Sequence, residues 1–191
     1  LSDRLKKNGK KAVTWNESLK GGNLNGDITV QFWLDNGGKT KKKATDGRDI
    51  ILSDFYRFYL DYPYGMTPLK KTYNSDGVIK QFGDRVIGLE AELWTEYIRD
   101  FDRLCYMGFP RLIAVAERAW TGDDICVYDD FKRRLRDILP TLPEDIKYAD
   151  ESEWDKTIVK RAAETVSFFA AASNSETVKS LINSARQKNN K

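Results

Sequence analysis

The sequence predicts an α/β protein with about four parallel strands, followed by a helical segment. Within the first 100 residues, short apolar runs rich in β-branched side chains alternate with turn residues. From about residue 105 onward, apolar residues recur at helical spacing instead. Each apolar run ends in aromatic and acidic residues, as in α/β barrels, where the C-terminal strand ends build the site. These observations favour part of a parallel barrel.

The four predicted strands lie at residues 11–15, 27–33, 49–53 and 85–94. Each run is bounded by Gly, Asn, Asp or Ser residues, which favour turns. The first two runs are joined by residues 21–26, whose sequence is Gly-Gly-Asn-Leu-Asn-Gly. Because glycine and asparagine disfavour helix, we expect a loop in this connection.

Two amphipathic helices are predicted after the strands. The first begins near Pro110, where a missing backbone N–H costs nothing, and the second opens at Asp129 and is stopped by Pro140 and Pro143. The expected core-facing residues of the first helix are Leu112, Ile113, Ala116 and Trp120. Those of the second are Leu135, Ile138 and Leu139.

Two more helices are predicted toward the C-terminus. Ser152 and Asp155 resemble a capping box at the start of the first. Its apolar residues recur at steps of four, at Ile158, Ala162, Val166 and Ala170. The final helix carries Val178, Leu181, Ile182 and Ala185.

Composition excludes several function classes. Of 191 residues, 40% are apolar and 32% charged, which is typical of a folded domain rather than of disorder. Net charge is only +3, too small for a nucleic-acid footprint, and the Lys41-Lys42-Lys43 run is expected to be a solvated loop. No apolar stretch approaches the about 20 residues of a membrane span.

The chain contains no histidine, which excludes histidine bases, Ser-His-Asp triads and histidine metal sites within it. Cys105 and Cys126 have no metal-ligand spacing, and we expect them to be buried thiols rather than a bridge. No metal or organic cofactor is implied.

Each predicted strand end combines an aromatic residue with a nearby carboxylate. Trp15 precedes Glu17, Trp33 precedes Asp35, Trp94 precedes Glu96, and an aromatic cluster after the third strand leads to Asp61. A tryptophan face covers the apolar patch of a pyranose, and a carboxylate accepts hydrogen bonds from its hydroxyls. The alternative is structural: the tryptophans would plug one end of the barrel, and the acids would be solvated caps. The pattern alone does not choose between them.

Two segments carry a resemblance to a known family. They are Gly-Leu-Glu-Ala-Glu-Leu-Trp-Thr-Glu at residues 88–96 and Phe-Pro-Arg-Leu-Ile-Ala-Val-Ala-Glu-Arg-Ala-Trp at residues 109–120. Both resemble the family 20 glycoside hydrolases, the β-N-acetylhexosaminidases. The resemblance covers about residues 1–125 and implies the C-terminal half of a (β/α)8 catalytic barrel, leaving residues 126–191 as a helical extension.

By resemblance, the site residues and their roles follow. Trp15, Trp33 and Trp94 would wall the pocket for the acetamido group of an N-acetylhexosamine-containing glycan. Tyr59 would hydrogen-bond the acetamido oxygen, which attacks the anomeric carbon in this substrate-assisted retaining mechanism. Asp61 and Glu96 would hold hydroxyls of the terminal sugar. In the helix motif, Arg111 and Glu117 are expected to form a structural ion pair or terminus contacts.

The chain departs from the family in one important way. The adjacent Asp-Glu pair that orients the acetamido group and donates the proton belongs after the fourth barrel strand, and Asp-Glu occurs here only at Asp150-Glu151, in the helical tail. The sugar-binding arginine near the first strand is also absent. We therefore expect an inactive part of a larger enzyme that needs the N-terminal half of the barrel. Homo-oligomerisation, compartment and the preference for glucosamine or galactosamine stay open.

Two other readings remain. In the first, the chain is a complete retaining glycosidase that uses Glu17 and Glu96 as acid and nucleophile, about 5 Å apart. In the second, it is a non-catalytic carbohydrate-binding or interaction module, which would keep the aromatic pocket and need no acid.

Overall fold

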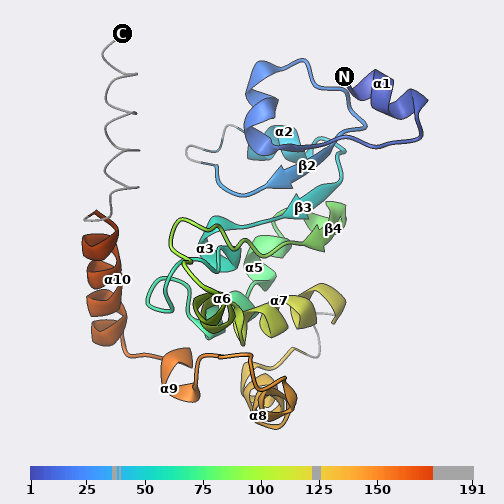
Figure 1. Ribbon diagram of the computed structural model, residues 1–191. Helices are drawn as coiled ribbons and strands as arrows, with labels where there is room; N and C mark the ends of the chain where they lie inside the picture. The colour runs from blue at the N-terminus through green and yellow to red at the C-terminus, as the bar shows by residue number, and fades with distance from the viewer. Residues whose placement is uncertain (36–37, 39, 122–125, 174–191) are drawn as a thin grey trace.

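The computed structural model describes residues 1–35, 38, 40–121 and 126–173, and four parallel strands form the sheet of this part of the chain. They are β1 (Val13–Trp15), β2 (Thr29–Phe32), β3 (Ile50–Leu52) and β4 (Val86–Leu89), and they lie side by side in chain order (Figure 1). The predicted parallel strands are therefore confirmed, each shorter than its apolar run.

The strand register separates the two faces of the sheet. Val30, which pairs with Ile50, belongs to the face buried under helices, and both side chains are fully buried. The next residues, Gln31 and Ile51, pair with each other and point to the opposite face because side chains alternate along a strand. That opposite face is the interior side of a barrel.

Short helices connect the strands. α1 (Ser2–Lys7) precedes β1, and the 3-10 helix η1 (Asn16–Gly21) follows it. α2 (Lys41–Thr45) joins β2 to β3; α3 (Phe55–Phe58), α4 (Leu69–Tyr73), α5 (Asp76–Ile79) and the 3-10 helix η2 (Gly83–Arg85) join β3 to β4. The predicted loop at residues 21–26 is irregular after η1 ends.

Two apolar clusters hold the described residues together. The first joins the buried face of the sheet to its helices through Val30, Leu52, Phe58 and Val115. The second lies among the later helices, around Phe131 and Leu135.

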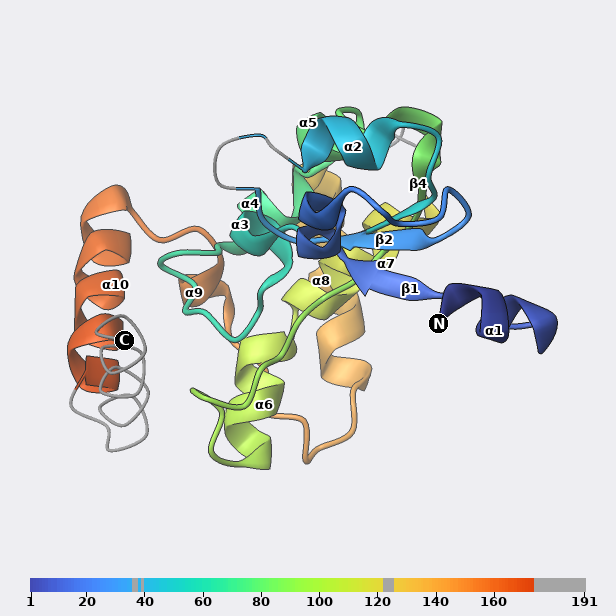
Figure 2. The same ribbon diagram turned by 90° about the horizontal axis from the view of Figure 1, so that it is seen from above.

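The later elements are α6 (Phe101–Gly108), α7 (Arg111–Trp120), α8 (Tyr128–Ile138), the 3-10 helix η4 (Leu139–Thr141), α9 (Glu151–Trp154) and α10 (Ile158–Ser173). Seen from above, α10 lies at the periphery beside the segment that follows α3 (Figure 2).

Three predicted helix faces differ from the structure, in whole or in part. In α7 the buried residues are Arg111, Ala114, Val115 and Arg118, whereas Ala116 is exposed and Trp120 is 91% exposed. The prediction relied on apolar spacing alone, but two arginines lie on the buried face of α7. In α8, Ile138 is exposed while Leu135 and Leu139 are buried as predicted.

In α10 the predicted stripe of Ile158, Ala162, Val166 and Ala170 is exposed. The face turned to the rest of the molecule carries Arg161, Thr165 and Phe168 instead.

The predicted capping box is also wrong. Asp150 is the N-cap of α9, and its side chain accepts the backbone N–H of Ser152. The chain then breaks before α10, so one expected helix is two. Likewise, Lys41-Lys42-Lys43 begins the short helix α2 rather than a loop, although Lys42 and Lys43 are exposed.

Three further expectations concern the cysteines, the membrane and the last helix. Cys105 is buried and Cys126 is half-buried, and both are free thiols. Within the described ranges, no helix combines the length and apolarity needed to cross a membrane. The helix predicted around Val178, Leu181, Ile182 and Ala185 lies outside the described residues.

Candidate functional site

A single cleft gathers the aromatic and acidic residues that follow the four strands. Its volume is about 700 Å³, within the range of small-molecule sites. Because the strands are parallel, their C-terminal ends meet at one edge of the sheet, and residues distant in sequence converge there. The cleft is lined by Trp15, Glu17, Trp33, Phe55, Tyr59, Asp61, Tyr62, Trp94, Glu96 and Tyr97.

Trp33 is fixed in the cleft by two neighbours. Its indole N–H donates to the Glu17 carboxylate at 2.6 Å, and its ring stacks on Tyr59 at 5.8 Å between centroids. Its backbone N–H donates to Asn16 Oδ1 at 3.2 Å, and Asn16 is itself buried. The position of Trp33 therefore depends on β1 as well as β2.

Trp15 and Trp94 form another part of the wall. Their ring centroids are 6.4 Å apart with an interplanar angle of 40°. Trp94 remains 42% exposed, so its ring has free surface facing the cleft. Flat aromatic faces of this kind suit the apolar side of a pyranose.

Tyr59 is a buried hydroxyl within the cleft lining. Burial raises the pKa of Tyr59, and the nearby Glu92 carboxylate adds to the effect. The hydroxyl therefore stays protonated at neutral pH and can donate a hydrogen bond to a ligand oxygen.

Asp61 is the most unusual group in the cleft. It is only 2% exposed, and its Oδ1 atom has no hydrogen-bond partner among the described residues. Burial raises the pKa of Asp61 to about 7, and the Glu96 carboxylate adds to this rise while Arg111 opposes it. A buried acceptor without a partner is costly, so this oxygen favours a ligand that supplies a donor.

Arg111 holds the segment that carries Asp61. Its guanidinium is fully buried and donates to the carbonyl oxygens of Leu60 at 2.6 Å and Tyr62 at 2.9 Å, the residues on either side of Asp61. It also donates to Thr67 O and Met107 O. Three N–H···O bonds from one rigid fork hold this loop, and two more join the fork to Met107 O of α6.

Arg111 and Glu117 are therefore not an ion pair with each other. Arg111 makes backbone contacts of the expected structural kind, whereas Glu117 accepts from both terminal nitrogens of Arg134 and from the Tyr73 hydroxyl.

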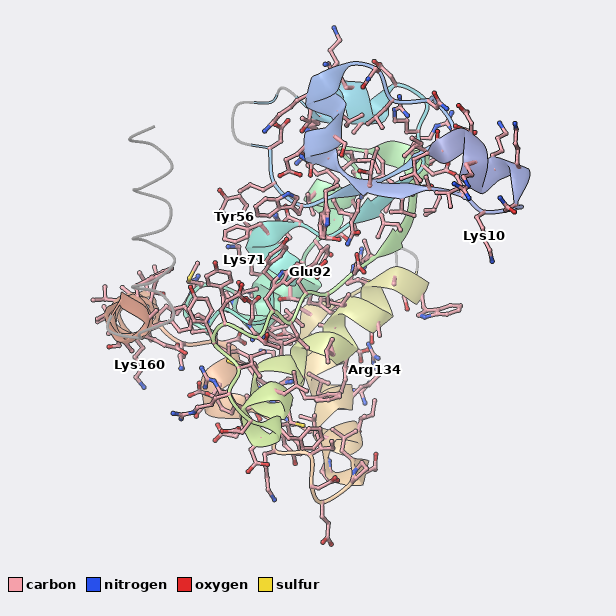
Figure 3. The ribbon with its side chains drawn as sticks, turned by 45° about the horizontal axis from the view of Figure 1, so that its top comes forward. Lys10, Tyr56, Lys71, Glu92, Arg134 and Lys160 are labelled. Carbon is pink, nitrogen blue, oxygen red and sulfur yellow. The ribbon has the colours of Figure 1, made fainter. Side chains whose placement is uncertain are left out.

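A second pair of acidic residues, Glu90 and Glu92, follows β4 outside the cleft lining. Gln31 Nε2 donates to Glu90 and to Glu92, and Ser53 Oγ donates to Glu90 Oε2 at 3.0 Å. Figure 3 shows Glu92 near the centre of the molecule. Burial raises the pKa of Glu92, and Glu90 adds to it.

The structure brings all six residues singled out from the sequence to this cleft: Trp15, Trp33, Tyr59, Asp61, Trp94 and Glu96. Sequence reasoning did not single out Tyr62 and Tyr97, which also line it. The available signal was that each directly follows a predicted site carboxylate. Asp35 is absent from the lining; its carboxylate instead accepts the N–H groups of Thr40 and Lys41 at the start of α2.

Asp150 and Glu151 lie away from the cleft lining. Asp150 caps α9, and Glu151 pairs with Arg136 of α8. Among the described residues, no group of three or more His, Cys, Asp and Glu side chains is placed to hold a metal ion.

Comparison with known proteins places the chain in a family. The family model described as "Glycosyl hydrolase family 20, catalytic domain" matches residues 1–123. A beta-hexosaminidase of Porphyromonas gingivalis is 33% identical over 147 residues, covering 69% of this chain and 19% of that protein. A beta-N-acetylhexosaminidase of Cellulomonas fimi is 33% identical over 148 residues, covering 69% and 30%. The chain thus spans at most about a third of these relatives' length.

Solved structures agree with this assignment. The GH20 beta-N-acetylhexosaminidase of Streptomyces coelicolor A3(2) superposes with a TM-score of 0.71 at 31% identity, covering 82% of this chain and 36% of that one. A mutant Streptomyces plicatus beta-hexosaminidase in complex with its product, GlcNAc, gives 0.68 at 33% identity, covering 79% and 34%. The predicted fold class, half of a (β/α)8 barrel followed by helices, is confirmed. The chain belongs to glycosyl hydrolase family 20.

Proposed function

We propose that this chain supplies the sugar pocket of an exo-β-N-acetylhexosaminidase, which removes terminal β-linked N-acetylglucosamine or N-acetylgalactosamine. The main support for the proposal is that three tryptophans, one tyrosine and two carboxylates converge on one cleft. These are the six residues that the resemblance to the family implies. The relatives named above are hexosaminidases, and one structural neighbour holds GlcNAc.

The pocket residues have different roles in binding. Trp15, Trp33 and Trp94 enclose the acetamido group and the apolar face of the sugar. Asp61 and Glu96 accept hydrogen bonds from ring hydroxyls. The three acids in the lining, with no lysine or arginine among the lining residues, suit a neutral ligand rich in hydroxyl donors.

Tyr59 acts on the reacting group. The mechanism is substrate-assisted: the acetamido oxygen attacks the anomeric carbon while a carboxylic acid protonates the leaving oxygen. The protonated Tyr59 hydroxyl donates a hydrogen bond to the acetamido oxygen and so holds it in line for attack.

We further propose that the acid comes from a part of the enzyme outside this chain. The engaged positions of Asp150 and Glu151 support this, because neither reaches the cleft lining. The edge strands support it as well: Val13 of β1 is 51% exposed and Ile87 of β4 is 58% exposed, so both edges leave apolar surface for further barrel strands.

The retaining alternative with Glu17 as acid is less well supported. Its carboxylate already accepts the Trp33 indole N–H at 2.6 Å and so is engaged in orienting a wall residue. The structural alternative for the tryptophans is also weakened, since all three line an open cleft rather than a plug.

The deciding experiment compares this chain alone with the chain combined with an upstream half-barrel that carries an adjacent Asp-Glu pair. Hydrolysis of an aryl N-acetyl-β-glucosaminide is measured, with Glu151→Gln as a matched control outside the cleft. We expect turnover only in the combination. Turnover by the chain alone, lost in Glu17→Gln, would instead support the complete retaining enzyme. Saturable quenching of tryptophan fluorescence by N-acetylglucosamine, without turnover in either preparation, would support a non-catalytic binding module.

A further inference from the structure

α10 is fastened to the loop that follows Asp61, although it lies beyond the family match, which ends at residue 123. Arg161 Nε donates to Gly65 O at 3.0 Å. The approach is so close that a Cβ atom at Gly65 would lie 2.6 Å from the Arg161 carbonyl oxygen. Lys156, just before α10, bridges Glu153 and Glu164 at 2.6 and 2.7 Å.

This attachment places Phe168 between two cleft residues. Its ring centroid is 4.7 Å from that of Tyr97 and 5.9 Å from that of Tyr62, and those two rings are 5.9 Å apart. Tyr62 directly follows Asp61, and Tyr97 directly follows Glu96. One side chain of α10 therefore contacts the neighbours of both Asp61 and Glu96.

The two carboxylates come from separate segments. Asp61 follows α3 and Glu96 follows β4, and the two residues are 35 positions apart in the sequence. Arg111 fixes the Asp61 segment, whereas Glu96 is exposed and makes no hydrogen bond or ion pair with the described part of the chain. The aromatic contact through Phe168 thus links the less constrained carboxylate to the more constrained one.

We propose that Phe168 is a positioning residue that ties the Asp61 and Glu96 segments together, so that both carboxylates meet the hydroxyls of one sugar. The C-terminal helix then sets hydroxyl recognition in the pocket without touching the ligand. This rests on the proposed function for the identity of the ligand. Figure 3 shows that α10 contacts the molecule along one side only, with Lys160 pointing outward, so the helix offers a matched control face.

The test uses the complete enzyme that contains this chain. Phe168→Ala is compared with two control variants. Phe168→Tyr keeps the aromatic ring, and Val166→Ala shortens a residue that is 69% exposed on the outer side of the same helix. KM and kcat are measured for an aryl N-acetyl-β-glucosaminide and for its 4-deoxy and 6-deoxy analogues.

We expect Phe168→Ala to lower kcat/KM for the parent substrate about tenfold, mainly through KM, because small misplacements of binding groups are costly. The same variant should lose much less kcat/KM for the 4-deoxy and 6-deoxy analogues. Hydroxyl discrimination, the ratio of kcat/KM for the parent substrate to that for an analogue, therefore falls. Phe168→Tyr and Val166→Ala should retain that discrimination. If Phe168→Ala does not fold by circular dichroism, Phe168→Leu takes its place.

Unchanged hydroxyl discrimination in folded Phe168→Ala or Phe168→Leu, or an equal loss in Val166→Ala, would overturn the inference while leaving the proposed function intact. A wild-type enzyme that neither binds nor hydrolyses the parent substrate would overturn the proposed function, and the positioning role with it.

Discussion

Replacing Asp61 by asparagine tests whether the cleft holds a carboxyl group with a raised pKa. Asp61 is almost fully buried, and its pKa of about 7 lies well above the ordinary value of 3.8. The folded chain therefore keeps this proton to a higher pH than the unfolded chain does. It follows that the unfolding free energy contributed by Asp61 is fully present below about pH 4 and is lost as the pH rises through about 7.

The magnitude follows from the size of the shift. A rise of about three pKa units corresponds to at most about 4 kcal/mol between the two protonation states. Asparagine has nearly the same shape as aspartic acid but does not ionise. We therefore expect wild type and Asp61→Asn to unfold at similar urea concentrations at pH 4.5, and wild type to unfold about 1–2 M earlier at pH 8.5.

The assay is urea unfolding followed by circular dichroism at both pH values. Asp84→Asn, a substitution at an exposed aspartate in η2, serves as the control and should track wild type at both. If the urea midpoints of wild type and Asp61→Asn keep a constant difference from pH 4.5 to 8.5, then Asp61 ionises normally in the folded state and the argument from its burial is refuted.

Three further substitutions test other parts of the site. Arg111→Met should lower the free energy of unfolding by at least about 4 kcal/mol, because four carbonyl oxygens lose their hydrogen-bond donor. Urea unfolding measures this loss, and a value below about 1 kcal/mol would contradict the prediction. Glu17→Gln still accepts the Trp33 indole N–H, so kcat/KM of the complete enzyme should fall about fivefold or less, corresponding to about 1 kcal/mol; complete loss of turnover would count against the orienting role. Gly65→Ala should displace α10 and increase its proteolysis, because the new Cβ would clash with its backbone, whereas Gly77→Ala meets no atom within 4 Å and should leave the proteolytic pattern unchanged.

The strands and the cleft were predictable from sequence because both depend on local patterns. Ile50 to Leu52 is a short aliphatic run that begins with two β-branched residues, and its assignment to a strand needs no knowledge of distant residues. Parallel strands then fix which ends converge, so Trp15, Trp33 and Trp94 could be placed together once the strands were assigned.

The helix faces were not predictable in the same way. Spacing identified Trp120 and Val166 as apolar and periodic, but a buried face is set by what lies opposite it. In α7 that face carries Arg111, whose guanidinium donates to Met107 O and to three carbonyl groups of a loop 44 to 51 positions earlier. No short sequence window contains Arg111 and that loop, so a charged side chain at the core could not be anticipated from periodicity.

The same limit explains why Tyr62 and Tyr97 were missed although their neighbours were found. Asp61 and Glu96 were assigned by motif, and a motif records the residues that meet the substrate, not those that hold the motif in place. The Tyr62 and Tyr97 rings lie 5.9 Å apart, and Phe168 of α10 packs against both. Because Phe168 lies outside the family match, one of the contacts between the two carboxylate segments comes from the C-terminal region. The residues proposed to bind the sugar and the residue proposed to set their spacing therefore come from two regions of one chain, and the sequence motif identifies only the first of them.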